Sequence, residues 1–283
     1  MSLRINTNVA ALNAYNNLSK NQNDLNSSFE KLSSGLRINK AADDASGMSI
    51  AQGLSSQING LTQAVSNAQD GINVAQIADG ALGTTQDILQ RMRTLVVQAG
   101  NSGTQDSAST TAISDEIKSL NTQLDNIANQ TKFGKTNLLD SSYDATKGTF
   151  QVGANGGDTL HLDLSGAAVD SGSLKTGGLN IVSNAGTYSN DSAAADLKTI
   201  DSAISQVSAE RSKIGAVQNQ LNYTVNNLQT GITNVTASRS NLTDADLATE
   251  VSKMSQSQIL MQASTSVLAQ ANSAPQAILK LLQ

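Results

Sequence analysis

The sequence predicts a mainly α-helical, elongated fold. We expect a long antiparallel helical hairpin or coiled-coil bundle whose N- and C-terminal helices pair, with a small β-hairpin region in the middle of the chain. Apolar residues recur at steps of three, four and seven over both ends of the chain, which is the spacing of one helical face. Proline, the strongest helix breaker, occurs once in 283 residues, at Pro275.

The first half of the chain is expected to hold three helices. One apolar stripe runs from Ile5 to Leu36, and a second resumes at Ile50 and continues to Ala99. A helix of about 50 residues would be roughly 75 Å long. The sequence Gly-Asn-Ser-Gly at 100–103 supplies a stop, and a shorter apolar stripe follows from Ile113 to Ile127.

The region from about 140 to 190 has a different character. It contains both Gly-Gly pairs of the chain, at 156–157 and 177–178, and two short alternating runs, at 150–152 and 160–164. Alternation with glycine-rich flanks is typical of short antiparallel strands joined by turns.

The last third carries the strictest periodicity. Seven apolar residues spaced seven apart run from Ile200 to Leu242, which is a coiled-coil signature. The companion seam includes Arg211, Gln218 and Arg239, which loosen it. We interpret this stripe as a core within one subunit. Spacings of seven then continue through Leu247, Met254, Met261 and Leu268.

Composition excludes several function classes. Aromatic residues make up 2% of the chain, so the core must be built from thin aliphatic layers. A net charge of −5 argues against nucleic-acid binding, which needs a basic face. The chain has no cysteine, which excludes disulfides and thiolate metal sites. We expect no membrane span and no cleaved secretory signal, because no sufficiently long apolar run is present.

Enzymatic and metal-binding interpretations fare badly. His161 is the single histidine and lies on an alternating run, so a surface strand residue is expected. Asp244 and Asp246 resemble the start of a calcium loop, but Thr249 and Ser255 stand where glycine and a carboxylate are needed. The glycine-rich run 153–158 does not open an amphipathic helix, so no phosphate loop is expected. We therefore expect no catalytic residue, metal or cofactor.

Both termini carry apolar stripes that no other apolar surface of the chain is large enough to cover. The simplest arrangement pairs the N-terminal helix with the C-terminal helix and buries the remaining apolar face against other copies. A head-to-tail contact that does not close into a ring builds a helical filament. The expected assembly residues are Ile5, Val9, Leu12, Leu18, Leu25, Leu247, Val251, Met254, Met261, Leu268, Leu279 and Leu282.

Several motifs resemble those of bacterial flagellins. The run Arg-Ile-Asn-Thr-Asn-Val-Ala-Ala-Leu-Asn at 4–13 is similar to the amino-terminal signature of that family. Leu-Ser-Ser-Gly-Leu-Arg-Ile-Asn at 32–39, followed by Ala-Asp-Asp-Ala-Ser-Gly at 42–47, is more specific, and Leu-Ala-Gln-Ala-Asn at 268–272 matches near the other end. The resemblance covers residues 1 to about 155 and about 195 to 283, in the family's order.

The resemblance implies a structural subunit of the extracellular flagellar filament, which propels swimming. Residues 1–44 and 240–283 would form an inner domain lining the filament channel, and 45–239 an outer rod, without the large outer domains of many flagellins. Implied partners are further copies of the chain, the hook-associated junction and cap proteins, and the flagellar export apparatus with its chaperone. Export would use the flagellar route.

The resemblance also suggests a host partner. Arg91, Leu95 and Glu116 match positions through which flagellins of this type contact the vertebrate Toll-like receptor that senses monomeric flagellin. Thr94 departs from the acidic residue usual in immunostimulatory members, which puts strong receptor activation in doubt. Three alternative functions remain open: a hook–filament junction protein, an unrelated coiled-coil adhesin or phage fibre, and an enzyme. The close match across residues 32–100 favours flagellin over the junction protein.

Overall fold

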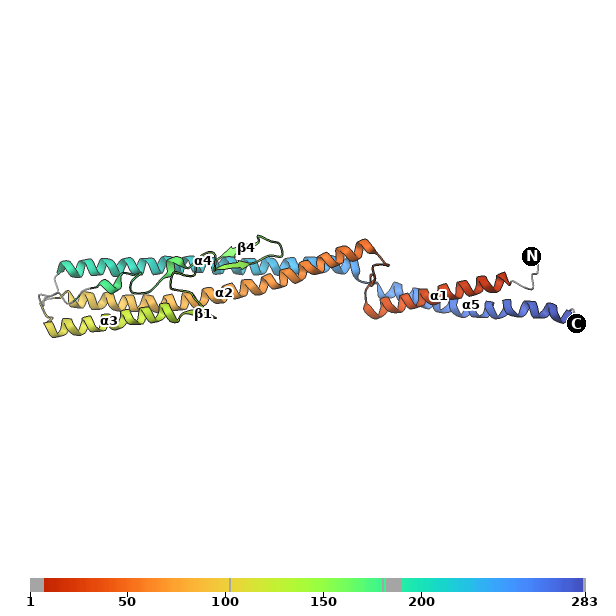
Figure 1. The fold of residues 1–283 in the computed structure, drawn as a ribbon, viewed down its shortest axis with the longest axis horizontal. Coiled ribbons are helices and arrows are strands. Elements are labelled where there is room, and N and C mark those ends of the chain that lie inside the picture. The colour runs from red at the N-terminus through yellow and green to blue at the C-terminus, as the bar shows by residue number, and fades with distance from the viewer. Residues whose placement is uncertain (1–7, 102, 180, 182–189, 282–283) are drawn as a thin grey trace. The chain divides into compact units, whose positions relative to one another are not determined.

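A computed structural model describes residues 8–101, 103–179, 181 and 190–281 (Figure 1). The helices are α1 (Val9–Ser34), α2 (Ala45–Ala99), α3 (Ser107–Gln130), α4 (Asn190–Thr243) and α5 (Leu247–Leu281). Between α3 and α4 lie the strands β1 (Lys132–Phe133), β2 (Thr136–Asn137), β3 (Thr149–Gln151) and β4 (Thr159–His161), and two 3₁₀ turns, η1 (Ser165–Ala167) and η2 (Thr176–Gly178). The mainly helical fold with a small β region is thus confirmed.

The chain forms two compact units. The terminal unit comprises Met1–Gln57 with Asn234–Gln283, and the central unit comprises Ile58–Thr233. These boundaries differ from the predicted ones at 44/45 and 239/240. Helices α2 and α4 are continuous through the new boundaries, so each helix contributes residues to both units.

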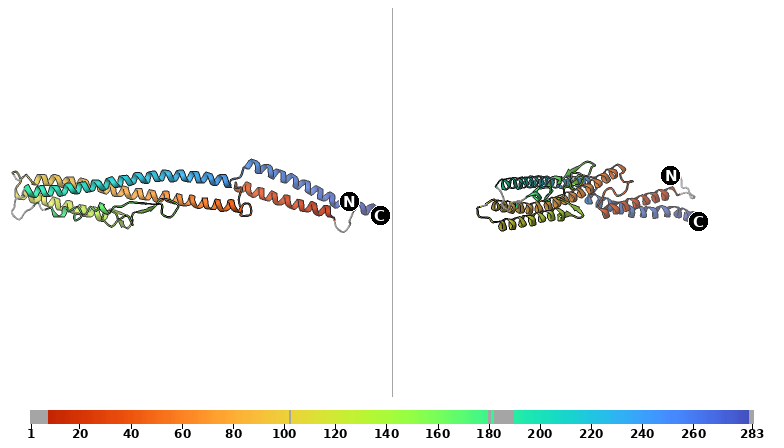
Figure 2. Two further views of the ribbon diagram at one scale, coloured as in Figure 1. Left: turned by 90° about the horizontal axis from the view of Figure 1, so that it is seen from above. Right: turned by 60° about the vertical axis from the view of Figure 1, so that its left-hand side comes forward.

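The terminal unit pairs α1 with α5, which lie side by side in all three views (Figures 1 and 2). Helix α1 ends at Ser34 and is capped by Gly35, whose φ of 71° is left-handed and therefore suits glycine. The N–H of Gly35 donates to Lys31 O at 2.9 Å, which satisfies one of the last carbonyls of the helix. The following loop is tied to the junction between α4 and α5, because Ala245 N donates to Gly35 O at 2.9 Å.

The central unit packs α2 against α3 and α4. Its apolar core holds Leu82, Leu89, Met92 and Leu95 from α2, all at most 1% exposed. Helix α3 adds buried aliphatic side chains at the predicted spacing, and α4 adds its heptad stripe. The buried members of that stripe are Ile200, Val207, Ile214, Leu221 and Leu228. The expectation that the stripe forms a core within one subunit is confirmed for these five residues.

Arg211, a polar member of the companion seam in α4, has specific partners. Arg211 Nε donates to Asp79 Oδ1 at 2.8 Å, and Arg211 Nη1 donates to Gln86 Oε1 at 2.8 Å. The nearby carboxylates raise the pKa of the Arg211 guanidinium, chiefly through its hydrogen bond to Asp79. This arginine therefore stays charged at the edge of the core and ties α4 to α2.

The β structure is shorter than predicted and begins earlier. The hairpin β1–β2 lies before residue 140, and the hairpin β3–β4 pairs Phe150 with Leu160. The predicted strand at 160–164 ends at His161 because the Asp163 carboxylate accepts from Ser165 N at 2.9 Å, which turns the chain into η1. After β4, the described residues up to 179 form turns, and the predicted region at 182–189 lies outside the described residues.

Candidate assembly surface on the terminal helices

Polar contacts fix α1 and α5 of the terminal unit to one another. The buried Ser28 hydroxyl donates to Glu250 Oε1 at 2.8 Å. Asn21 Nδ2 donates to Ser264 Oγ at 3.0 Å, several turns further along the pair. A hydrogen bond to a charged acceptor is stronger than one between neutral groups, so the contact between Ser28 and Glu250 is the stronger of the two.

Both helices begin at a side-chain cap. Asn8 Oδ1 accepts from Ala11 N at 3.1 Å at the start of α1. Asp246 performs the same task for α5, with Oδ2 accepting from Thr249 Oγ1 at 2.8 Å and Oδ1 from Ala248 N at 3.0 Å. The hydrogen bonds from Thr249 and Ala248 lower the pKa of the Asp246 carboxyl. Asp246 therefore serves as the cap at the start of α5.

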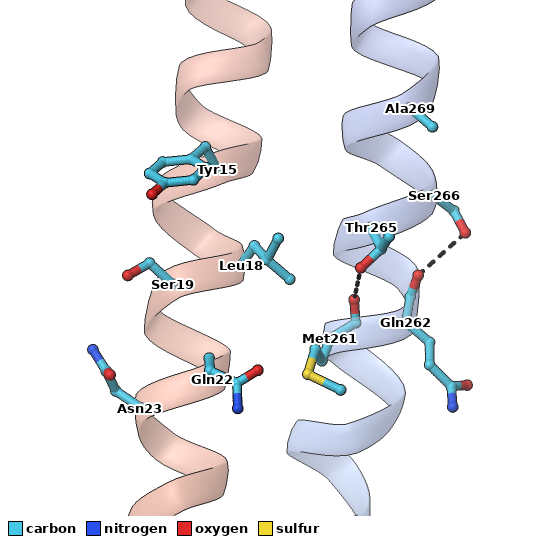
Figure 3. A pocket seen from close by; sticks show the side chains of 10 residues that line it. All are labelled: Tyr15, Leu18, Ser19, Gln22, Asn23, Met261, Gln262, Thr265, Ser266 and Ala269. Carbon is cyan, nitrogen blue, oxygen red and sulfur yellow. Dashed lines mark hydrogen bonds between the residues drawn. The ribbon is translucent and has the colours of Figure 1, made fainter.

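The apolar seam between the two helices is thin. Ala14 and Leu25 are buried, whereas Leu18, Met254, Met261 and Leu268 are half-buried. An open groove of about 770 Å³ lies where the seam is incomplete, and Leu18 and Met261 reach into it from opposite helices (Figure 3). Two helices alone therefore leave much of their apolar surface in water.

The exposed apolar residues are concentrated on this unit. Leu12 is 56% exposed and Tyr15 60%, although both belong to the predicted apolar stripe. Monomeric proteins rarely expose extended apolar surface, so such a surface marks an interaction site. The large apolar side chains exposed on α1 and α5 are Val9, Leu12, Tyr15, Phe29, Leu247, Val251, Ile259, Leu260 and Val267.

The predicted assembly residues fall into three groups. Leu25 is buried inside the helix pair, and Leu18, Met254, Met261 and Leu268 line its seam. Val9, Leu12, Leu247 and Val251 are exposed. Ile5 and Leu282 lie outside the described residues, and only the backbone of Leu279, in α5, is described.

Sequence reasoning did not assign five of the exposed side chains to the surface. Tyr15 and Phe29 lie on the predicted stripe of α1 and could have been assigned from their spacing. Ile259, Leu260 and Val267 fall beside the seven-residue line of α5, so the heptad pattern concealed them. An apolar residue beside a heptad line is the signal that would have identified these three.

The central unit separates the three predicted receptor residues. Arg91 and Glu116 are at the surface, where Arg91 Nε donates to Glu116 Oε1 at 2.8 Å and so bridges α2 and α3. Leu95 is 1% exposed and packs inside the core. The side chain of Leu95 therefore supports this surface from beneath and does not present itself on it.

Three further expectations from the sequence concern His161, a metal site and a membrane span. His161 is exposed on β4, as expected, and its Nδ1 lies 2.9 Å from Thr149 Oγ1 and 3.1 Å from Ala145 O. Over the residues that the structure describes, no three His, Asp or Glu side chains gather as a metal site would require. Within the same residues, no helix combines the length and apolarity needed to cross a bilayer.

Comparison with known proteins shows to which family this architecture belongs. A profile for the bacterial flagellin N-terminal helical region matches residues 5–144, and one for the bacterial flagellin C-terminal helical region matches residues 197–282. The chain is 43% identical to a flagellin of Bacillus subtilis over 304 aligned residues, covering 99% of this chain and all of that protein. The chain belongs to the bacterial flagellin family.

A second relative agrees with this chain in length as well as in sequence. A flagellin of Halalkalibacterium halodurans is 42% identical, with 99% of each chain covered. A crystal structure of Bacillus cereus flagellin aligns with 58% of this chain and 88% of its own, at 32% identity and a TM-score of 0.47. The two family profiles leave residues 145–196 unmatched, so this chain is a short flagellin with little sequence between its two terminal regions. Like other flagellins, it is a structural subunit of the extracellular flagellar filament.

Proposed function

We propose that the exposed apolar face of α1 and α5 is the surface through which this flagellin polymerises. The observation that carries the proposal is the contrast between the two units. The central unit buries its heptad stripe in its own core, whereas the terminal unit leaves nine large apolar side chains exposed on two helices. Burial of apolar area is the main driving force of association, so the terminal unit gains most from contact with copies of itself.

The proposed arrangement places the terminal unit at the inside of the filament, with residues 1–44 and 240–283 lining its channel. Residues from about 45 to 239, which include the central unit with its own core, then form the outer shell. This assignment agrees with the resemblance and with the distribution of exposed apolar side chains.

Truncation of either terminal helix tests the proposal. Chains lacking residues 1–30, or residues 255–283, should remain soluble monomers when mixed with filament seeds. Their central unit should still unfold cooperatively, because its core lies within 58–233. Filaments of normal diameter from either truncated chain would show that the apolar face of α1 and α5 is not the polymerisation surface.

We further propose that the chain has no enzymatic activity and that its other partners are flagellar. The hook-associated junction and cap proteins would meet its terminal regions at the two ends of the filament, and export would use the flagellar apparatus with its chaperone. Purified filaments should show no hydrolytic activity above a buffer control. Retention of the chain inside cells that lack a functional flagellar export apparatus would support the export route, and normal secretion would contradict it.

The surface around Arg91 supports a second proposal, contact with the Toll-like receptor that senses flagellin. Arg91 and Glu116 are exposed and fixed by their mutual ion pair, and Thr94 is exposed on the same helix. Arg91→Ala should lower receptor signalling by the monomer, while Thr94→Asp should raise it if an acidic residue completes the contact. Lys118→Ala, which changes an exposed charge of α3, is the matched control. Equal signalling by Arg91→Ala and the parent would exclude Arg91 as a contact.

A further inference from the structure

Helix α5 contains a proline in its interior. The helix extends from Leu247 to Leu281 and so continues past Pro275. A proline has no backbone N–H, so Pro275 cannot donate the helical hydrogen bond to the carbonyl four residues earlier, which belongs to Ala271. A backbone carbonyl that is removed from water without a hydrogen-bond donor destabilises the fold, unless another donor reaches it.

The replacement donor comes from the start of α1. Asn8 Nδ2 donates to Ala271 O at 2.8 Å in a part-buried contact that joins residues 263 positions apart. The oxygen of the same amide group caps α1 by accepting from Ala11 N at 3.1 Å. An asparagine amide has both a donor and an acceptor, so one side chain caps one helix and fills the gap in the other.

The apolar seam of α5 does not define a unique alignment with α1. Met254, Met261 and Leu268 are spaced seven apart, so a slip of seven residues would bring similar side chains to the same places. In coiled coils, a single polar contact between helices is sufficient to specify the register. Because of Pro275, the carbonyl of Ala271 lacks the helical N–H donor that its neighbours have. A slip of seven residues would move this carbonyl away from Asn8.

We propose that Asn8 and Pro275 form a register lock for the terminal unit. The proline frees the carbonyl of Ala271, and the Asn8 amide satisfies that carbonyl in the correct alignment of α1 with α5. The consequence for assembly rests on the proposed function, because the alignment decides which apolar side chains of α1 and α5 share the polymerisation surface. Asn8 is thus a positioning residue, which acts on assembly through the alignment of the two helices.

A double-mutant cycle on the full-length chain tests the lock. Asn8→Ser retains an equally good N-cap but removes the amide donor. It should raise the critical concentration for seeded polymerisation about tenfold, since the part-buried carbonyl of Ala271 loses its partner. In a Pro275→Ala background the new backbone N–H serves Ala271, so the same substitution should change the critical concentration less than about twofold.

A matched control separates the lock from general packing. Asn21→Ser removes the other amide contact between α1 and α5, the one to Ser264. Its effect should be the same factor in the Pro275 and Pro275→Ala backgrounds, because Ser264 O–H is not a helical backbone group. If Asn8→Ser raises the critical concentration by the same factor in both backgrounds, then Asn8 acts only as a helix cap and the lock is overturned.

The carbonyl carbon chemical shift of Ala271 provides a readout that does not depend on polymerisation. In the soluble monomer, Asn8→Ser should move this resonance, and the movement should be much smaller in the Pro275→Ala background. No movement in the parent background would overturn the lock. If the shift moves as expected while both Asn8→Ser and a change to the exposed apolar face leave polymerisation unaltered, the lock stands and the proposed assembly role of the terminal unit fails.

Discussion

Replacement of Leu12 by glutamine offers a direct test of the assembly surface. Leu12 is 56% exposed on α1, so its removal takes little from the packing of the isolated chain. Glutamine has nearly the same helix propensity as leucine and a similar length. The substitution should therefore leave the fold of the monomer intact and remove the gain in free energy when a neighbouring subunit covers the side chain.

The size of the effect follows from the exposed fraction. Full burial of a leucine side chain contributes about 1.5–3 kcal/mol, so covering the 56% that is exposed contributes about 0.8–1.7 kcal/mol per subunit. A difference of about 1.4 kcal/mol changes an equilibrium constant tenfold, so the critical concentration should rise about 4- to 17-fold.

The assay is the concentration of monomer left in the supernatant after seeded filaments are pelleted. Asn16→Gln is the matched control, because Asn16 is exposed one turn further along the same face of α1. It should leave the critical concentration unchanged, and circular dichroism should show equal helix content for both variants and the parent. An unaltered critical concentration for Leu12→Gln would refute the burial of Leu12 between subunits.

Four further perturbations have defined outcomes. Leu268→Asp should prevent filament pelleting, because an unpaired charge in the packed seam costs several kcal/mol; long filaments from this variant would show that the seam stays hydrated. Leu89→Ala, at a fully buried position of the central unit, should lower the free energy of unfolding in urea by about 2.7–5 kcal/mol. Arg211→Gln should lower it by less than about 1 kcal/mol, because both side chains of the 2.8 Å pair with Asp79 are 37–38% exposed. Asp106 caps α3, and the hydrogen bonds from Ser109 hold the pKa of its carboxyl below the ordinary 3.8. The cap therefore stabilises α3 above pH 3.8, and this stabilisation is lost as the pH falls through the lower folded-state pKa. Amide exchange at the start of α3 should accelerate in that lower pH range, and Asp106→Asn should remove this pH dependence.

Helix positions could be read from the sequence because they depend on local spacing. The stripe from Ile200 to Leu228 predicted a buried face of α4, and all five residues are buried. The stop at 100–103 agrees with the end of α2 at Ala99. The family motifs likewise depend only on residue order, so the flagellin resemblance needed no structure.

The partners of each face depended on the tertiary structure. Arg91 and Leu95 are one helical turn apart and were both expected at the surface, yet Leu95 is buried because the central unit packs other elements against that part of α2. Leu12 and Leu25 belong to one stripe of α1, but the single partner helix α5 covers only Leu25 well. Periodicity identifies an apolar face, whereas the number of helices packed against it decides how much of that face remains for another subunit.

The amide of Asn8 shows most clearly the difference between what the sequence determined and what the tertiary structure decided. From the sequence, Asn8 is a residue of the amino-terminal motif and Pro275 is a helix breaker, and nothing in local spacing connects them. The connection exists because α1 and α5 pair, which brings the start of one helix to the carbonyl that the proline leaves without a donor in the other. The sequence determined the helices, their apolar faces and the family, because these follow from the order of residues close together in the chain. Only the folded chain decided which distant polar groups meet and which apolar side chains remain exposed for assembly, because both depend on contacts between residues far apart in the sequence.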